Sequence, residues 1–415
     1  MSAISRRELL ALAAAFPGLE TLSRHLPQQA PHRVTTAPPA GPLGEADWQR
    51  IKDQFVIDGL HLNTGTYGAC PLPVLDATIQ HLRAFERIIG QEAVDWPAFK
   101  GEVESFLNAW PGSVAVLRNT TEAMNNAAAG IDLAPGDEVL STTHEHIGGR
   151  CCWELLARRR GVVYRTFAPP LDPADDDELV AAWQAQITPR TRVLSIAHVL
   201  FTTGMIQPVA KLVRLARQRG IISVVDGAHP PGMLHVDLQA LDADFYATST
   251  HKWLLAPKGT GLLVVHPDRI ATTWPLVASG DWAAANIERF EHVGTSNESL
   301  VQGLRAAVAF QRAIGQDVIE QRDRGLATRL FDGLARLPRV HLVSPHNAAL
   351  RSAMVSFTMD GTTAEHLQGY LGRYRIRTRR IAEFGYEYLR LSTHIYVLQR
   401  DVDHTIDLLR DAPVD

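Results

Sequence analysis

The chain has 415 residues, of which 46% are hydrophobic, and a formal net charge of -4. This length supports one large domain and a smaller one, and the charge provides no basic field for binding nucleic acid. No apolar run approaches the roughly 18–20 residues of a membrane span. The three cysteines, Cys70, Cys151 and Cys152, predict neither a disulfide framework nor a zinc site.

The N-terminal region resembles a twin-arginine export leader. Ser-Arg-Arg at residues 5–7 precedes an Ala- and Leu-rich run that ends near Leu19. An ordinary amphipathic first helix is the alternative. Five prolines then mark a linker. We therefore expect a leader over residues 1–26 and a linker over residues 27–44. If residues 1–26 direct export, we expect the enzyme in the periplasm. If they do not, we expect it in the cytoplasm.

Past the linker, short apolar runs alternate with helical patterns. Continuous apolar runs are typical of parallel strands buried on both faces, and alternation at this spacing predicts crossover helices. The predicted strands are Val114–Leu117, Glu138–Leu140, Val162–Tyr164, Thr191–Ile196, Ile221–Val225, Asp244–Ala247 and Gly261–Val265. The predicted helices are Thr121–Gly130, Gly148–Arg160, Asp177–Ala185 and Pro208–Arg219. We expect an α/β large domain over residues 45–310, with a mostly parallel seven-stranded sheet and helices on both faces.

From about residue 300 the pattern changes. Two longer helical patterns lead into alternating strands and one more helix, which predicts a small α+β domain over residues 311–415. Its expected elements are helices Leu300–Ile314, Asp317–Leu334 and Ala364–Leu371, and strands Val340–Val343, Ala353–Thr358, Arg375–Arg379 and Tyr388–Ser392.

Polar side chains follow the first two predicted strands. Thr120 and Thr121 stand at the start of a predicted helix, where backbone N–H groups and hydroxyls can cradle a phosphate. A plain capping box is the alternative. After the next strand, His144 and His146 lie two residues apart without further metal ligands. An imidazole stacked on a flat ring fits this segment better than a metal.

A carboxylate follows the strand that ends at Val225. Asp226 precedes the small turn Gly227–His229, and ligands of open α/β sheets bind at such strand ends. A carboxylate in this place can keep a pyridine nitrogen protonated, which makes the ring an electron sink. A turn cap is the alternative role.

A lysine follows the next strand. Lys252 comes after Ser249, Thr250 and His251, and only five of the 41 Lys and Arg residues in the chain are lysine. A lysine at a strand end with small and hydroxyl neighbours is a Schiff-base candidate, although most lysines lie on the surface. Lys258 competes, but it sits in a Pro/Gly turn. The two strand ends together predict pyridoxal phosphate (PLP) bound to Lys252.

Four motifs occur in an order that resembles the class V aminotransferase family of PLP fold type I. They are Asn119–Glu122, Glu145–His146, Val225–His229 and Ser249–Lys252. This family includes cysteine desulfurases, kynureninase and isopenicillin N epimerase. The resemblance runs from about Leu62 to Ile406, and the Thr202–Met205 segment is similar to the epimerase-like branch.

The resemblance implies cofactor roles for the matching positions. Lys252 is the expected attachment point and proton carrier, Asp226 the partner of the ring nitrogen, and His146 the residue stacked on the ring. His229 is expected near the phenolic oxygen of the cofactor. The implied phosphate ligands are Thr120, Thr121, Ser249 and His251.

The resemblance also implies a partner subunit and substrate ligands. Thr295 matches a residue that reaches the phosphate of the neighbouring subunit, so a homodimer with shared active sites is expected. Arg377 matches the arginine that binds the substrate carboxylate, and Arg390 is a second candidate. Guanidinium–carboxylate pairing suits that role, although surface ion pairs are the alternative. Asn63 lies in the segment Leu62–Gly68, which resembles the loop that closes over substrate in the epimerase-like branch.

Two differences from the cysteine desulfurase pattern narrow the range of reactions that the enzyme is expected to catalyse. The chain has no cysteine after Cys152, which argues against a persulfide-type desulfurase, and Phe201 stands where a desulfurase has asparagine. We expect an enzyme of the aminotransferase or epimerase type, acting on the α-carbon or amino group of an amino acid or amino-acid-derived substrate. A β-lyase, an exported tailoring enzyme for a peptide or siderophore, and a non-catalytic PLP-binding protein remain as alternatives.

Overall fold

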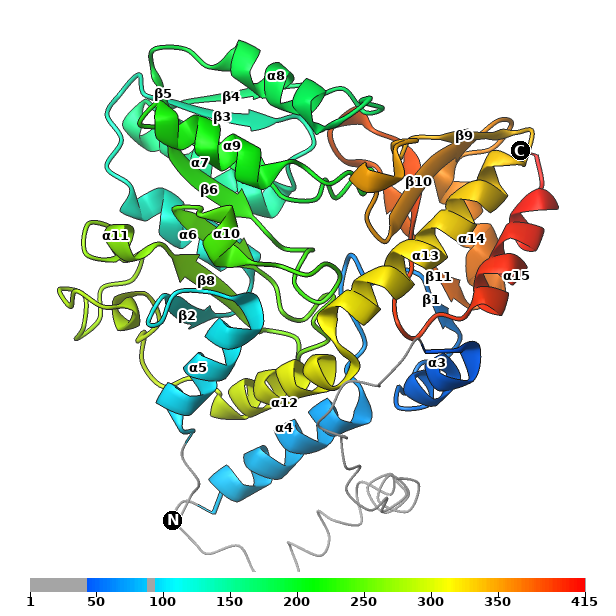
Figure 1. Ribbon diagram of the computed structural model, residues 1–415, viewed down its shortest axis with the longest axis horizontal. Helices are drawn as coiled ribbons and strands as arrows, with labels where there is room; N and C mark the ends of the chain where they lie inside the picture. The colour runs from blue at the N-terminus through cyan, green and yellow to red at the C-terminus, as the bar shows by residue number, and fades with distance from the viewer. Residues whose placement is uncertain (1–42, 88–93, 415) are drawn as a thin grey trace, which may run out of the picture. The chain divides into compact units, whose positions relative to one another are not determined.

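The computed structural model describes residues 43–87 and 94–414, which belong to one compact unit (Figure 1). The predicted leader over residues 1–26, and the predicted linker up to residue 42, lie outside the described residues. Helix α12 (Glu298–Ile314) crosses residue 310, where the boundary between the two domains is predicted.

The central element is a seven-stranded sheet. Strand β8 is antiparallel to both of its neighbours, and the other neighbouring pairs are parallel, which confirms the mostly parallel sheet that was predicted. In spatial order the strands are β2 (Val114–Leu117), β8 (Gly261–Val265), β7 (Phe245–Thr248), β6 (Ile222–Asp226), β5 (Thr191–Ala197), β3 (Glu138–Thr142) and β4 (Val163–Phe167).

Alternate residues along the strands enter two different cores. In β7, Phe245 packs into one core and Tyr246 into the other, as expected for a sheet covered on both faces. Helices α6 (Thr120–Gly130) and α7 (Ile147–Arg160) cover the first face, with α11 (Pro267–Ile270) and η1 (Ile287–Phe290) at its edge. The second face is covered by α5 (Trp96–Leu107), α8 (Asp176–Gln186), α9 (Val209–Gln218), α10 (Leu238–Leu241) and α12.

Three elements precede α5. They are α3 (Glu45–Lys52), β1 (Leu60–His61) and α4 (Leu72–Phe85), and α4 packs along α12 (Figure 1). Between β1 and α4, the loop through Asn63 and Thr66 reaches the polar pocket described below.

The C-terminal part holds an antiparallel four-stranded sheet in the order β12 (Arg379–Ile381), β13 (Tyr388–Ser392), β10 (Met354–Met359), β9 (Val340–Leu342). The remaining elements are α13 (Gln316–Ala335), η2 (Ala348–Leu350), α14 (Ala364–Arg373), β11 (Ile376–Arg377), η3 (Glu383–Gly385) and α15 (Gln399–Arg410). The single strand predicted over Arg375–Arg379 is wrong. The chain changes partners at Thr378, because β11 pairs with β1 whereas β12 pairs with β13.

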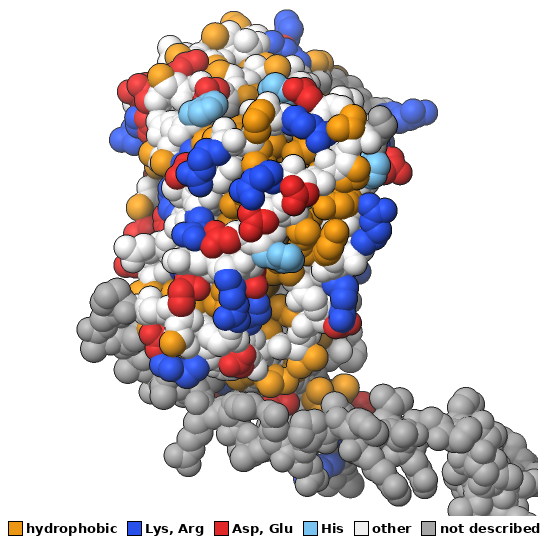
Figure 2. Space-filling model, turned by 90° about the vertical axis from the view of Figure 1, so that its right-hand side faces the viewer, with side chains coloured by type: hydrophobic (Ala, Val, Ile, Leu, Met, Phe, Trp, Pro, Cys, Tyr) orange, Lys and Arg blue, Asp and Glu red, His pale blue; other side chains and the backbone are white. Residues whose placement is uncertain are grey.

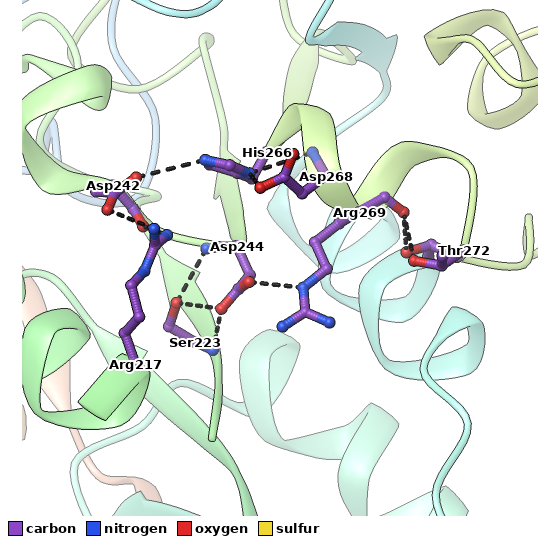
Figure 3. Close-up of polar contacts among 9 residues, drawn as sticks. Arg217, Ser223, Asp242, Asp244, His266, Asp268, Arg269 and Thr272 are labelled. Carbon is purple, nitrogen blue, oxygen red and sulfur yellow. Dashed lines mark hydrogen bonds and ion pairs between the residues drawn. The ribbon is translucent and has the colours of Figure 1, made fainter. Parts of the chain in front are cut away.

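The amino ends and the carboxyl ends of the strands in the large sheet carry different kinds of polar groups. At the amino end of β7, Asp244 accepts hydrogen bonds from Ser223 N–H (2.8 Å) and Arg269 Nε (2.7 Å), which tie β6, β7 and α11 together (Figure 3). These groups satisfy one another's hydrogen bonds and hold the three elements together. The pocket lies at the other end of the strands, where β6 and β7 end.

The face of the molecule in Figure 2 carries basic and acidic side chains interspersed with one another. None of the helices in residues 43–87 and 94–414 combines the length and apolarity needed to cross a membrane.

Candidate active site

A cavity of about 340 Å³ lies at the carboxyl ends of β6 and β7. It brings together most of the site residues predicted from the sequence. Its walls include Thr120, Thr121, His146, Asp226, His229, Ser249, His251, Lys252 and Arg390, together with Phe201, Thr66 and Arg379. Within the described residues no cluster of His, Cys, Asp or Glu is arranged to hold a metal.

Asp226 is the last residue of β6 and is 6% exposed. Its Oδ1 accepts a hydrogen bond from Ala228 N–H at 2.9 Å. Burial raises the pKa of Asp226, whereas the Lys252 ammonium and the Ala228 N–H act in the opposite direction. A charged partner in the cavity therefore stabilises the ionised carboxylate.

A second carboxyl group, Glu145, lies beside Asp226 and is 1% exposed. Its Oε1 accepts a hydrogen bond from His146 N–H at 2.8 Å. Burial and the negative charge of Asp226 raise the pKa of Glu145 well above its usual value, which favours the protonated carboxyl at neutral pH, and its buried Oε2 has no hydrogen-bond partner among the described residues. A Cβ atom at residue 149 would lie 2.5 Å from Glu145 Oε1 and 2.9 Å from Asp226 Oδ2, so only Gly149 fits against the pair.

Lys252 follows β7 in a turn closed by a hydrogen bond from its own N–H to the Ser249 carbonyl (3.2 Å). Burial lowers the pKa of Lys252 to about 8, although the charge of Asp226 raises it. A larger fraction of this amine than of an ordinary lysine is therefore unprotonated near neutral pH, as a nucleophile or a proton acceptor requires.

His146 is the N-cap of α7, and its Nδ1 accepts a hydrogen bond from Gly148 N–H at 3.0 Å. Burial and the charges of Lys252 and Arg390 lower its pKa to about 3, so the ring is neutral. Phe201 holds it edge-on, with ring centroids 5.0 Å apart. His144 is turned elsewhere, because its Nδ1 lies 2.7 Å from Thr202 Oγ1. The two histidines are therefore not joint metal ligands.

The phosphate-type cradle forms where α6 meets the turn after β7. Ser249 Oγ accepts a hydrogen bond from Thr120 N–H at 2.9 Å and lies 2.7 Å from Thr120 Oγ1. Thr121 follows in the first turn of α6, and His251 donates from Nδ1 to the Thr260 carbonyl at 2.9 Å. Hydroxyls and the start of a helix thus meet at one end of the cavity, a favourable place for an anion.

Arg390 supplies a buried positive charge to the cavity wall. It is 2% exposed, and it donates to the Phe201 carbonyl (2.6 Å) and to Asn63 Oδ1 (3.3 Å). Its Nε has no hydrogen-bond partner, and no carboxylate pairs with it among the described residues. Burial lowers its pKa to about 9. A carboxylate that entered the cavity could pair with this desolvated guanidinium and neutralise its charge.

Three predicted residues lie outside the walls of this cavity. Asn63 contacts it through Arg390 and lines the neighbouring groove. Arg377 lies exposed over the Tyr67 ring, 4.6 Å from the ring centroid, and lines that groove as well. Thr295 is exposed in the segment before α12.

Arg379 and Glu145 are the residues of the site that sequence reasoning did not assign a role. Arg379 lines the cavity and is ion-paired with Glu383. Its alternation with Arg377 was the available signal; both arginines line the neighbouring groove, but only Arg379 also lines the cavity. Glu145 could have been found from its place directly before His146.

The donor set fits pyridoxal phosphate. A buried carboxylate suits the pyridine nitrogen, a partly buried amine suits covalent attachment, a neutral imidazole suits the ring face, and hydroxyls at a helix start suit the phosphate. Lys252, Asp226 and His146 would hold the ring, with Thr120 and Ser249 at the phosphate.

Comparison with known proteins agrees with this geometry. The family model for class V aminotransferases matches residues 91–404. An isopenicillin N epimerase of Streptomyces clavuligerus is 34% identical, covering 88% of this chain and 98% of its own. A probable cysteine desulfurase of Xylella fastidiosa is 30% identical, covering 80% and 85%.

Solved structures are similar as well. A C-DES mutant with glycine covalently linked to its PLP cofactor has a TM-score of 0.78 and 25% identity, covering 87% of this chain and 99% of its own. The cysteine desulfurase CsdA of Escherichia coli has the same TM-score and identity, covering 90% and 99%. The chain therefore belongs to the class V aminotransferase family, has the PLP fold type I, and is an enzyme that uses pyridoxal phosphate.

Proposed function

We propose that the enzyme epimerises the α-carbon of an amino acid, or of the amino-acid end of a larger molecule. The observation that carries the proposal is that the Lys252 amine and the Arg390 guanidinium line the same cavity. Arg390 has no carboxylate partner among the described residues. Similarity to the isopenicillin N epimerases supports this reaction type, and the lack of a cysteine after Cys152 argues against persulfide formation.

Each residue has a defined task in this reaction. Arg390 binds the α-carboxylate of the substrate, and the Lys252 amine removes the α-proton; return of a proton to the opposite face of the same carbon completes the epimerisation. Asp226 keeps the pyridine nitrogen protonated, and His146 holds the ring face in place. When bound, PLP supplies the electron sink that makes the α-proton acidic.

The test is incubation of the holoenzyme in D₂O with single enantiomers of amino acids and of short peptides. We expect deuterium at Cα and loss of optical purity without net loss of substrate. Formation of a keto acid would instead indicate transamination, and ammonia with pyruvate would indicate a β-lyase. Either product without epimerisation overturns the proposal.

We further propose that the enzyme is a homodimer, with Thr295 at the active site of the partner. Five apolar side chains in the segment before Thr295 are each 43–51% exposed, and contact with a second subunit would cover them. They are Trp274, Leu276, Val277, Trp282 and Val293. Sedimentation should give twice 45.7 kDa, and Trp282→Glu should shift it to the monomer, whereas Val414→Glu should not. A wild-type monomer would contradict this proposal.

Export by the twin-arginine route is also a proposal, based on residues 5–7 and the apolar run after them. Periplasmic recovery of the protein, lost when both arginines become lysine, would support it. Recovery from the cytoplasm alone would contradict it.

A further inference from the structure

The residue that follows Lys252 contacts the cavity through a histidine. Trp253 is fully buried, and its Nε1 lies 3.1 Å from Nδ1 of His229, which is itself 4% exposed. An indole N–H can only donate a hydrogen bond, so Nδ1 of His229 must be the acceptor. Burial and the charge of Lys252 lower the pKa of His229, so the ring is neutral and carries its single hydrogen on Nε2.

Trp253 is itself held from the other side. Its carbonyl accepts hydrogen bonds from Gln311 Nε2 (2.9 Å) and His394 Nε2 (3.0 Å). His394 Nδ1 lies 2.7 Å from Asp323 Oδ2, and neither side chain is exposed. These contacts come from α12, α13 and the segment after β13, and they fix the backbone directly after Lys252. Because the indole is also fully buried, it is held against His229.

We propose that Trp253 is a positioning residue that sets the tautomer of His229, so that His229 offers its Nε2–H to the phenolic oxygen of the bound cofactor. His229 lines the cavity beside Lys252, and Trp253 is its only hydrogen-bond partner in the described part of the chain. The inference concerns the cofactor before any substrate binds, so it holds or fails independently of the epimerisation proposed above.

Phe201, which lines the cavity together with His229, explains why the tautomer of His229 matters. Phe201 lines the same wall of the cavity and has no hydrogen-bond donor, so the oxygen depends on His229. A histidine donates from Nε2 only when that nitrogen carries the hydrogen. Because Trp253 occupies Nδ1 as an acceptor, it excludes the other neutral tautomer. A carboxamide at position 229 would not need this control, because it always carries N–H groups.

The experiment compares four holoenzymes: wild type, Trp253→Phe, His229→Gln and the double variant. One readout is the absorbance of the lysine-bound cofactor, titrated against pH. Lys252, Arg390 and His146 face His229 and also influence this titration. Loss of one hydrogen bond to the charged oxygen should raise the pKa of this titration by about one unit in Trp253→Phe. In the His229→Gln background the same change should have no effect.

The second readout is ¹⁵N NMR of histidine-labelled wild-type protein, with the His229 signal assigned by its absence in His229→Gln. We expect a ring with hydrogen on Nε2 at neutral pH. A ring with hydrogen on Nδ1 would overturn the proposal even if Trp253→Phe fails to fold. Equal pKa shifts from Trp253→Phe in both backgrounds would overturn it as well, since they would indicate a general structural role.

Discussion

Replacing Lys252 with alanine is expected to abolish covalent attachment of PLP and to lower kcat by about 10⁴-fold or more, because one amine both anchors the cofactor and moves the α-proton. The measurement is kcat together with the absorbance of the bound cofactor. A small added amine should restore part of the activity, because it can accept the proton in place of the missing side chain.

Lys258→Ala is the matched control for this prediction. Lys258 lies six residues further on, with its Nζ 3.8 Å from Cys70 Sγ, and does not line the cavity. It should keep the covalent absorbance band. Loss of the band in Lys258→Ala, with its retention in Lys252→Ala, would transfer the role to Lys258.

Asp226→Asn is expected to lower kcat by about 10²–10³-fold, the size found when one preorganised electrostatic contact is removed from an active site. An amide cannot keep the pyridine nitrogen protonated, so the ring becomes a weaker electron sink. The measurement is kcat for the variant reconstituted with saturating PLP.

Glu145→Gln is the informative comparison, because glutamine keeps a hydrogen-bond donor beside Asp226 and the protonated Glu145 has no charge to lose. We expect a change in kcat of less than about tenfold, within the range of one neutral hydrogen bond. Equal losses in both variants would show that Glu145 carries the essential negative charge.

The strands of the large sheet could be predicted because they are buried on both faces and therefore contain continuous apolar runs. The site at their ends followed from the same pattern. Asp226 closes the β6 run, and Lys252 lies just beyond β7, where a polar residue has no role in the core. The sequence pattern alone therefore placed both residues at the strand ends that line the cavity.

Contacts between distant segments could not be predicted in this way. The Glu145–Asp226 pair depends on how the ends of β3 and β6 approach each other, and the Trp253–His229 bond joins two separate turns. Arg377 was matched to the substrate carboxylate by its motif. However, the strand partner changes at Thr378, and of the two arginines only Arg379 lines the cavity, whereas Arg377 lines the neighbouring groove alone.

The measurement that tests the central claim most directly is borohydride reduction of the yellow holoenzyme, followed by peptide mapping by mass spectrometry. Reduction fixes the cofactor to the lysine that holds it. We predict a single pyridoxyl-modified peptide, with the label on Lys252. A label on Lys258 or another lysine, or an unlabelled protein that has nevertheless lost its yellow colour, would contradict the assignment.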